Sequence, residues 1–266
     1  MFVELNHLLN SSPDKLRQGE LTLICDVKTD GSFLVHHFLS LYLRAGCKVC
    51  FVALVQSFSH YNIIAKKLGV NLTAAKEQGQ LIFLEGLKSS VDMLLGERQK
   101  SEQTNPLQFI SDTGSDLKVL YDFVRESLMP SSTESWKCPV LLVDDVSILL
   151  SLGVRAIHLL DFLHYCRATI CSQLKGNMVV LVHSSADSED EENELVVNYL
   201  CHFSNLILWV EGLATGFCKD VHGQLRITWK GSCRMKGEKD VVKDYQYKIQ
   251  DKNVTFFARG TSAAVL

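Results

Sequence analysis

The feature that most constrains the fold is an unbroken apolar segment, Val-Leu-Leu-Val at residues 140–143, that runs directly into Asp144 and Asp145. Four apolar residues without polar alternation are typical of a parallel strand that is buried on both faces. Parallel strands of α/β proteins bind ligands at their carboxyl ends, where an Asp commonly orients Mg²⁺ beside a nucleotide phosphate. The segment therefore predicts an α/β protein with a cleft beside the two aspartates.

The sequence of the first strand-to-helix turn, residues 26–33, indicates whether that cleft can bind a nucleotide phosphate. A phosphate-binding loop needs Gly, four residues, then Gly-Lys-Ser/Thr, because its backbone N–H groups, Lys and hydroxyl hold phosphates and Mg²⁺. Here Asp26 replaces the first Gly, Gly31 keeps the second, Ser32 replaces the Lys and Phe33 replaces the hydroxyl residue. Such a turn repels an anion. We therefore expect no nucleotide, cofactor or metal ion and no catalytic residue.

Apolar runs and helical patterns alternate along the chain in the order typical of βα units. This order predicts an α/β fold with a three-layer core, a mostly parallel central sheet and C-terminal antiparallel hairpins. We expect a single domain over residues 1–266, with a lead segment at 1–20 and a closing hairpin region at 206–266. The predicted strands are residues 21–25, 48–55, 80–84, 139–143, 177–183, 206–211, 223–230, 245–250 and 254–259.

Composition excludes several classes of protein. The net charge of −3 provides no basic field that would attract nucleic acid or membrane to the whole molecule. Nine cysteines scattered through apolar runs indicate reduced thiols of a cytoplasmic or nuclear protein, not a disulfide framework. A zinc or redox role for Cys47-x-x-Cys50 is disfavoured, because residues three apart on a strand point to opposite faces. No apolar run is long enough to suggest a membrane span.

One predicted helix, residues 33–45, is apolar nearly all round and should lie between two surfaces. We expect it, together with aromatic residues on exposed faces of the closing hairpins (Trp229 and Phe256 or Phe257), to contribute to a partner surface.

Two polar segments follow the strand at 177–183. His183 and the two serines after it fit a nucleotide sensor or a polar turn, and the missing phosphate loop favours the turn. The acidic run at 187–194 fits a solvated loop or a helix first turn.

The order of elements, the position of the phosphate loop and the strand ending in Asp resemble the RecA/KaiC ATPase core. Four segments, at residues 28–39, 56–61, 139–145 and 247–252, are similar to the family of the sixth subunit of the Elongator complex in its animal form. This resemblance implies a RecA-like fold that has lost its nucleotide signatures. It also implies a heterohexameric ring with the fourth and fifth subunits, contact with the other Elongator subunits, and a role in carboxymethyl-type modification at C5 of tRNA wobble uridines.

The resemblance implies a chain without catalysis of its own, since the chemistry in Elongator belongs to a radical-SAM and acetyltransferase subunit. The chain lacks the Cys-x3-Cys-x2-Cys pattern of such a cluster. Asp144 and Asp145 match the family's magnesium position. Without a Lys and a hydroxyl beside them, we expect a structural role, either in capping turns or in pairing with a cation of a neighbouring subunit.

Basic residues concentrate in the closing region and are candidates for contact with tRNA. They are Arg226, Lys230, Arg234 and Lys236, with Lys239 and Lys243 nearby and with Trp229 and Tyr245 available for stacking on bases. A solvated basic loop is the competing interpretation. Two other functions also stay open at this point: an active RecA-like ATPase of DNA repair, and an unrelated α/β adaptor.

Overall fold

The computed structural model describes residues 1–86, 88–89, 91, 106–107, 116–130, 135–184, 190–214, 216, 218–231 and 239–258. Arg234, Lys236 and the first part of the acidic run at 187–194 lie outside the described residues. The described end of that run forms a helix start, because Asp190 accepts a hydrogen bond from the Asn193 N–H and three glutamates occupy the first turn.

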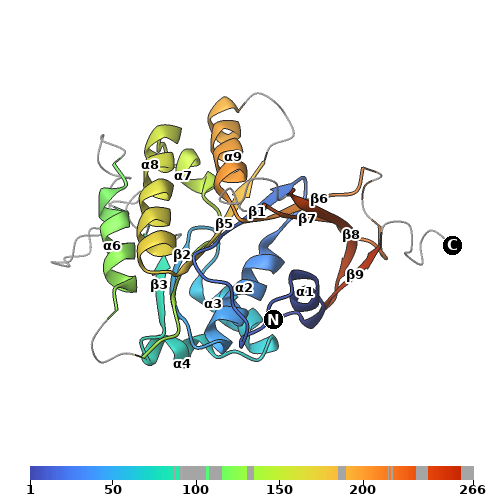
Figure 1. Ribbon diagram of the computed structural model, residues 1–266, viewed down its shortest axis with the longest axis horizontal. Coiled ribbons are helices and arrows are strands. Elements are labelled where there is room, and N and C mark those ends of the chain that lie inside the picture. Colours follow the sequence, from blue (N-terminus) through green and yellow to red (C-terminus); the bar gives the residue numbers. More distant parts are fainter. Residues whose placement is uncertain are drawn as a thin grey trace.

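The strands that the structure describes join into one mixed sheet. They are β1 (Leu21–Val27), β2 (Lys48–Ala53), β3 (Leu81–Glu85), β4 (Pro139–Val143), β5 (Asn177–His183), β6 (Leu206–Glu211), β7 (Gly223–Trp229), β8 (Val241–Ile249) and β9 (Val254–Ala258). Their order is β3-β2-β4-β5-β1-β6-β7-β8-β9 (Figure 1). The strands from β3 to β6 pair in parallel, and β7, β8 and β9 add antiparallel pairs. The predicted mostly parallel sheet with antiparallel C-terminal strands is confirmed.

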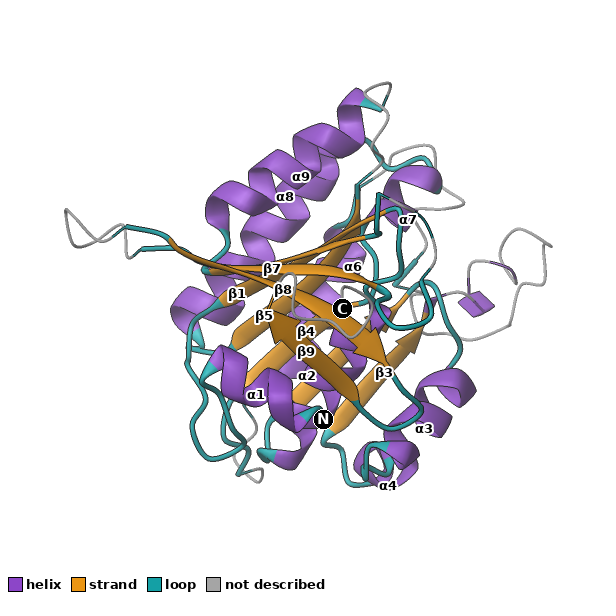
Figure 2. Cartoon of the chain, turned by 90° about the vertical axis from the view of Figure 1, so that its right-hand side faces the viewer, coloured by secondary structure: helices purple, strands orange, loops and turns teal. Residues whose placement is uncertain are grey.

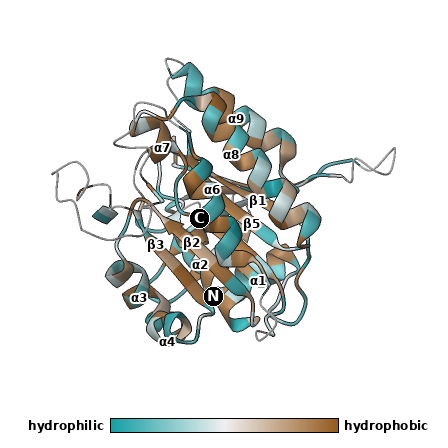
Figure 3. Ribbon diagram, turned by 90° about the vertical axis from the view of Figure 1, so that its left-hand side faces the viewer, coloured by the Kyte–Doolittle hydropathy of each residue, from teal (hydrophilic) through white to brown (hydrophobic). Residues whose placement is uncertain are grey.

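Helices cover both faces of this sheet, which gives three layers (Figure 2). The first face carries α1 (Val3–Leu9), α2 (Ser32–Arg44), α3 (Phe58–Lys67) and α4 (Leu72–Glu77). The second carries α6 (Lys118–Leu128), α7 (Ser147–Ser151), α8 (Ala156–Cys166), the π-helical turn η2 (Arg167–Gln173) and α9 (Glu191–Phe203). Within β1, Ile24 packs into the first layer, and Leu23 and Cys25 pack into the second. Apolar residues accordingly fill the strands, and polar residues lie on the outer helix faces (Figure 3).

The helix predicted at 33–45 is buried, and the structure shows what covers it. Every residue of α2 from Phe33 to Leu43 is buried, including both histidines. The chain supplies its own cover, since Phe2 stacks on His37 and Tyr247 of β8 lies against Phe33 at 5.0 Å between ring centroids. The expectation that this helix forms a partner surface is therefore wrong.

The aromatic residues of the closing hairpins also differ from expectation. Trp229 and Phe256 are half-buried and pack against the core on the α2 face of the sheet, and Phe257 is half-buried as well. The strand β6 is not purely a hairpin strand, because it pairs in parallel with β1 and antiparallel with β7. This strand is where the parallel core changes into the antiparallel extension.

Candidate functional site

A cleft of about 480 Å³ lies at the carboxyl ends of β1 and β4, between the start of α2, α3 and the turn after β8. It occupies the position that the sequence predicted. Among the described residues that line it, the carboxylates outnumber the lysines: the acids are Asp26, Asp30, Asp144, Asp145 and Asp251, and the lysine is Lys67. The electrostatic character of the cleft is therefore opposite to that of a phosphate site.

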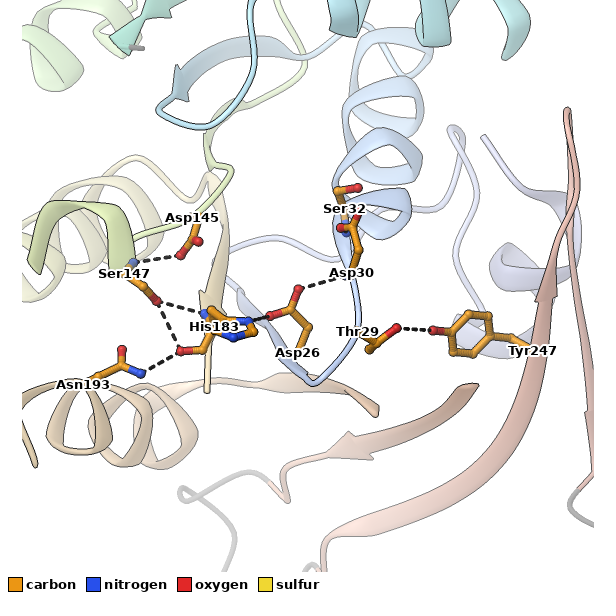
Figure 4. Close-up of polar contacts among 10 residues, drawn as sticks. Asp26, Thr29, Asp30, Ser32, Asp145, Ser147, His183, Asn193 and Tyr247 are labelled. Atoms are coloured by element: carbon orange, nitrogen blue, oxygen red, sulfur yellow. Dashed lines mark hydrogen bonds and ion pairs between the residues drawn. The ribbon is translucent and has the colours of Figure 1, made fainter. Parts of the chain in front are cut away.

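The degenerate loop at the end of β1 is folded around one of its own carboxylates. The Gly31 N–H donates to Asp26 Oδ2 at 2.8 Å, and the Ser32 N–H donates to Asp30 Oδ1 at 2.8 Å (Figure 4). A Cβ at Gly31 would lie 3.1 Å from Asp26 Cβ and 3.3 Å from Asp26 Oδ2. Two backbone N–H groups at the start of α2, of the kind that a phosphate would need, thus already bind carboxylates of the chain.

The other loop replacement, Phe33, has a packing role. The side chain is 6% exposed and lies between Phe2 and Tyr247. Thr29, within the same turn, shares a hydrogen bond of 3.3 Å with the Tyr247 hydroxyl (Figure 4). An aromatic ring that anchors the turn to β8 therefore stands where a phosphate loop has its magnesium-binding hydroxyl.

His183 faces Asp26 across two adjacent strand ends. Its Nδ1 lies 2.8 Å from Asp26 Oδ1, and its backbone N–H and C=O are bound by Ser147 Oγ and by Asn193 Nδ2 (Figure 4). Burial raises the pKa of Asp26, while the Gly31 N–H and His183 act in the opposite direction. The interpretation of His183 as part of a polar turn missed this pair. The pairing depends on β5 lying beside β1, which the local sequence does not reveal.

Asp144 is the most fully bound carboxylate of the cleft. It is 4% exposed, and its Oδ1 accepts from the Leu54 N–H at 2.7 Å. Its Oδ2 accepts from the Val55 N–H at 3.1 Å and from the Tyr61 hydroxyl at 2.8 Å. Burial raises the pKa of Asp144 against the effect of these donors. Asp144 therefore caps the turn between β2 and α3, which is the first of its two predicted structural roles.

Asp145 is half-buried and accepts a hydrogen bond of 2.8 Å from the Ser147 N–H at the start of α7 (Figure 4). Burial raises its pKa to about 6, and the nearby carboxylates Asp26 and Asp144 add to the rise. In the described part of the chain, no group of three or more His, Cys, Asp or Glu residues has the arrangement of a metal site. The cleft can attract a cationic group, but it offers an anion only carboxylates and backbone groups that are already bound.

The predicted tRNA-contact residues that the structure describes lie on or after β7, away from the cleft lining. Arg226 Nε binds Asp244 Oδ1 at 2.8 Å, and Lys230 Nζ binds Asp240 Oδ2 at 3.0 Å. Lys243 Nζ lies 5.6 Å from the centre of the Trp229 ring. Aspartates at or beside β8 thus neutralise Arg226 and Lys230, whereas Lys243, which pairs with Ile227, lies on the other face of the hairpin from Arg226.

Comparisons with known proteins place the chain in a family. The family model described as Elongation complex protein 6 matches residues 2–251. The chain is 63% identical over 266 residues to Elongator complex protein 6 of Xenopus laevis, with 100% of both chains covered, and 62% identical over 269 residues to that of Homo sapiens, also with 100% of both covered. A more distant relative, Elongator complex protein 6 of Dictyostelium discoideum, is 23% identical with 91% of each chain covered.

No helix in the described ranges is both long and apolar enough to cross a bilayer.

The match over nearly the whole chain agrees with the resemblance that the four sequence segments indicated. The chain belongs to the Elongation complex protein 6 family and is a subunit of the Elongator complex.

Proposed function

We propose that this chain is a non-catalytic structural subunit of Elongator that assembles with the fourth and fifth subunits into a heterohexameric ring. The ring is required for carboxymethyl-type modification at C5 of tRNA wobble uridines, and other subunits perform the chemistry. Family membership supports the assignment to Elongator. The cleft supports the non-catalytic role, because it keeps the position of a nucleotide site without the chemistry of one.

The observation that carries the non-catalytic role is the hydrogen bond from the Gly31 N–H to Asp26 Oδ2. A nucleotide phosphate would have to replace this carboxylate at the start of α2 and then lie close to Asp30 and Asp145, with Lys67 as the lysine of the cleft. Like charges that are partly shielded from water repel strongly. The free energy of the site therefore favours the empty, internally bonded turn over bound ATP.

Two experiments separate this function from the alternatives. Mass spectrometry of tRNA nucleosides from cells lacking the chain should show loss of 5-carbamoylmethyl- and 5-methoxycarbonylmethyl-uridine, with recovery when the chain is expressed again. Unchanged levels of both nucleosides would reject the proposal and leave the adaptor alternative. Calorimetric titration of the purified chain with ATP and Mg²⁺ should show no binding in the micromolar range. Micromolar binding, with a DNA-repair defect in the same cells, would favour the ATPase alternative.

A finer proposal concerns tRNA. We propose that Arg226, Lys230, Arg234 and Lys236 contact the tRNA backbone within the assembled ring. The support is their closeness in the sequence to one another and to Trp229. Arg226 and Lys230 would exchange aspartate partners for phosphates.

Reversing two charges, with Arg226→Glu and Lys230→Glu, should weaken tRNA binding by the ring without affecting its assembly. The loss should become smaller at high salt, because phosphate contacts are screened. Lys66→Glu on the exposed surface of α3 is the matched control. Equal tRNA binding by the double variant and the control would reject a contact at these residues.

A further inference from the structure

A pair of thiols lies at the opposite end of the sheet from the acidic cleft. Cys47 immediately precedes β2, Cys138 immediately precedes β4, and their Sγ atoms are 3.2 Å apart. The two residues are 91 positions apart in the sequence. Neither thiol takes part in the acidic cleft or in the hydrogen bonds described for it above.

The backbone holds the two cysteines opposite one another. The strands β2 and β4 are paired in parallel, with Lys48 opposite Pro139. Hydrogen bonds lie on both sides of the thiol pair: Lys137 N–H to Gly46 O at 2.9 Å, and Lys48 N–H to Cys138 O at 3.1 Å. Adjacent strands are about 4.8 Å apart, which falls within the range of about 4.4–6.8 Å between the Cα atoms of disulfide-bonded cysteines. A disulfide therefore requires motion of side chains and no rearrangement of the strands.

One of the two thiols lines a pocket with a small exposed fraction, and the other is enclosed. Cys138 is 5% exposed and lines a pocket of about 220 Å³, whereas Cys47 is 0% exposed and does not line this pocket. The charged side chains among the described residues that line this pocket are lysines, namely Lys48, Lys137 and Lys175. A pocket of this kind favours the thiolate form of a cysteine and attracts anionic or polar oxidants.

The two thiols also differ in acidity. A hydrogen bond shared with Cys47 and the charge of Lys137 hold the pKa of Cys138 below its usual value against the effect of burial. The same hydrogen bond and burial raise the pKa of Cys47. By contrast, burial raises the pKa of Cys50 to about 12. Because Cys138 is also the thiol that lines the lysine-rich pocket, it is favoured as the attacking sulfur, and Cys47 is positioned as the second thiol.

We propose that Cys138 and Cys47 form a redox-modification site that closes to a reversible intramolecular disulfide when a hydroperoxide oxidises Cys138. The Cys138 thiolate attacks the terminal peroxide oxygen, the O–O bond breaks, and sulfenic acid and hydroxide or alkoxide form. The Cys47 sulfur then attacks the Cys138 sulfur, the S–O bond breaks, and water leaves with the Cys47 proton. Two thiols lose two electrons in total, and one peroxide is reduced. A dithiol reductant restores both thiols by exchange.

The test uses the full-length chain, titrated with hydrogen peroxide, alkylated and mapped by mass spectrometry without reduction. The expected result is a peptide pair linked through Cys47 and Cys138, formed at lower peroxide doses than oxidation of the half-exposed Cys201 or Cys218. The link should disappear on treatment with dithiothreitol. Oxidation of Cys201 or Cys218 first, with Cys47 and Cys138 still alkylated as free thiols, would overturn the proposal.

Variants distinguish the two roles. Cys47→Ser should stop the reaction at the sulfenic acid of Cys138, which dimedone captures, and Cys138→Ser should leave Cys47 reduced at the same dose. Cys218→Ser is the matched control and should form the link as the parent chain does. If Cys138 of the Cys47→Ser variant gives no dimedone adduct, the proposed order of attack is wrong.

A second measurement does not depend on any variant folding well. Because the link joins positions that are 91 residues apart, it should raise the melting temperature of the parent chain by roughly 5–10 °C, and the reductant should reverse the rise. A melting temperature that peroxide leaves unchanged while the linked peptide is present would show that the bridge forms only in unfolded chains.

Discussion

The two ends of the parallel sheet are stabilised by different kinds of side chain. At the amino end, amides bind the backbone. Asn177 accepts from the Glu20 N–H at 3.0 Å and donates to the Arg17 carbonyl at 2.8 Å. Gln80 donates to the Leu43 carbonyl, in the last turn of α2, and to a second carbonyl, at 2.8 and 3.1 Å.

At the carboxyl end, carboxylates bind the backbone. Asp26 accepts from the Gly31 N–H and Asp144 from two N–H groups of the turn before α3. Glu85, at the end of β3, accepts from the N–H of Phe58, the first residue of α3, at 3.1 Å. All of these bonds are to N–H groups at or near helix starts.

The difference follows from the polarity of helices. In a βα unit the carboxyl end of the strand meets a helix N-terminus, which exposes N–H donors and favours negative charge. The amino end of the next strand meets a helix C-terminus, which exposes carbonyls and needs a donor. An amide supplies donor and acceptor without charge, whereas a carboxylate supplies only acceptors and loses hydration when buried. The hydrogen bonds that carboxylates make at the carboxyl end should therefore depend on pH, and those that Asn177 and Gln80 make at the amino end should not.

The largest effect is expected from Asp144→Ala. The substitution leaves the buried Leu54 N–H, the part-buried Val55 N–H and the buried Tyr61 hydroxyl without an acceptor, at a cost of about 3–5 kcal/mol in the free energy of unfolding. Urea denaturation at pH 7.5 measures this loss. Asp251→Ala, on the exposed side of the same cleft, is the control and should change stability by less than about 0.5 kcal/mol. A loss below about 1 kcal/mol for Asp144→Ala would contradict the capping role.

The next prediction places a carboxylate at the amino end. Asn177→Asp keeps the shape of the side chain but directs a buried, charged oxygen at the Arg17 carbonyl, since Asn177 is 1% exposed. We expect a loss of about 2–3 kcal/mol at pH 7.5. Burial would raise the folded-state pKa of the new carboxyl group, so the penalty should decrease as the pH falls and the protonated group donates to Arg17. An equal loss at pH 5 and pH 7.5 would show that charge is not the cause.

The reverse exchange at the carboxyl end is expected to stabilise the protein. The pKa of Asp145 rises from 3.8 to about 6 on folding. Between these values the folded state binds more protons than the unfolded state, so stability is lost as the pH rises through this window. The rise corresponds to at most about 3 kcal/mol, which partial exposure reduces to about 1–2 kcal/mol.

Asp145→Asn keeps an oxygen for the Ser147 N–H and removes the charge. It should raise the free energy of unfolding by that 1–2 kcal/mol at pH 7.5 and leave it unchanged near pH 4, where Asp145 is protonated in the folded state and increasingly so in the unfolded state. Denaturation curves of the parent and the variant at both pH values provide the measurement. A gain that is the same at both values would indicate a packing effect in place of a charge effect.

The sequence predicted the features of the two sheet ends whose residues lie close together in the chain. The loss of the phosphate loop was evident because residues 26–33 are contiguous, and the apolar runs gave the parallel core. The separation of Cys47 and Cys50 onto opposite faces is also confirmed, since the two thiols belong to different core clusters.

The remaining contacts join residues that are distant in sequence. Asp26 and His183 are 157 positions apart, and Tyr61 and Asp144 are 83 apart. Such pairs follow from the order of strands in the sheet, which alternating βα patterns alone do not specify. The cover of α2 by Phe2 and Tyr247 was missed for the same reason: an apolar helix shows that it is buried, but not which segment buries it.

The smallest effect on stability is expected for exposed charges that lie away from both ends of the parallel sheet. Arg226 and Asp244 form an ion pair across β7 and β8 with side chains that are 58% and 45% exposed. Water screens such a pair, so Arg226→Gln should lower the free energy of unfolding by less than about 0.5 kcal/mol, and 0.5 M salt should remove the difference. Asp244→Asn is the matched variant and should give the same small change. A loss of about 2 kcal/mol for either would show that charge in the hairpins matters as much as it does in the cleft. Arg226→Gln alone could also leave stability unchanged while the ring loses affinity for tRNA. Arg226 would then act in recognition, because a side chain that folding does not require is available to exchange Asp244 for a phosphate.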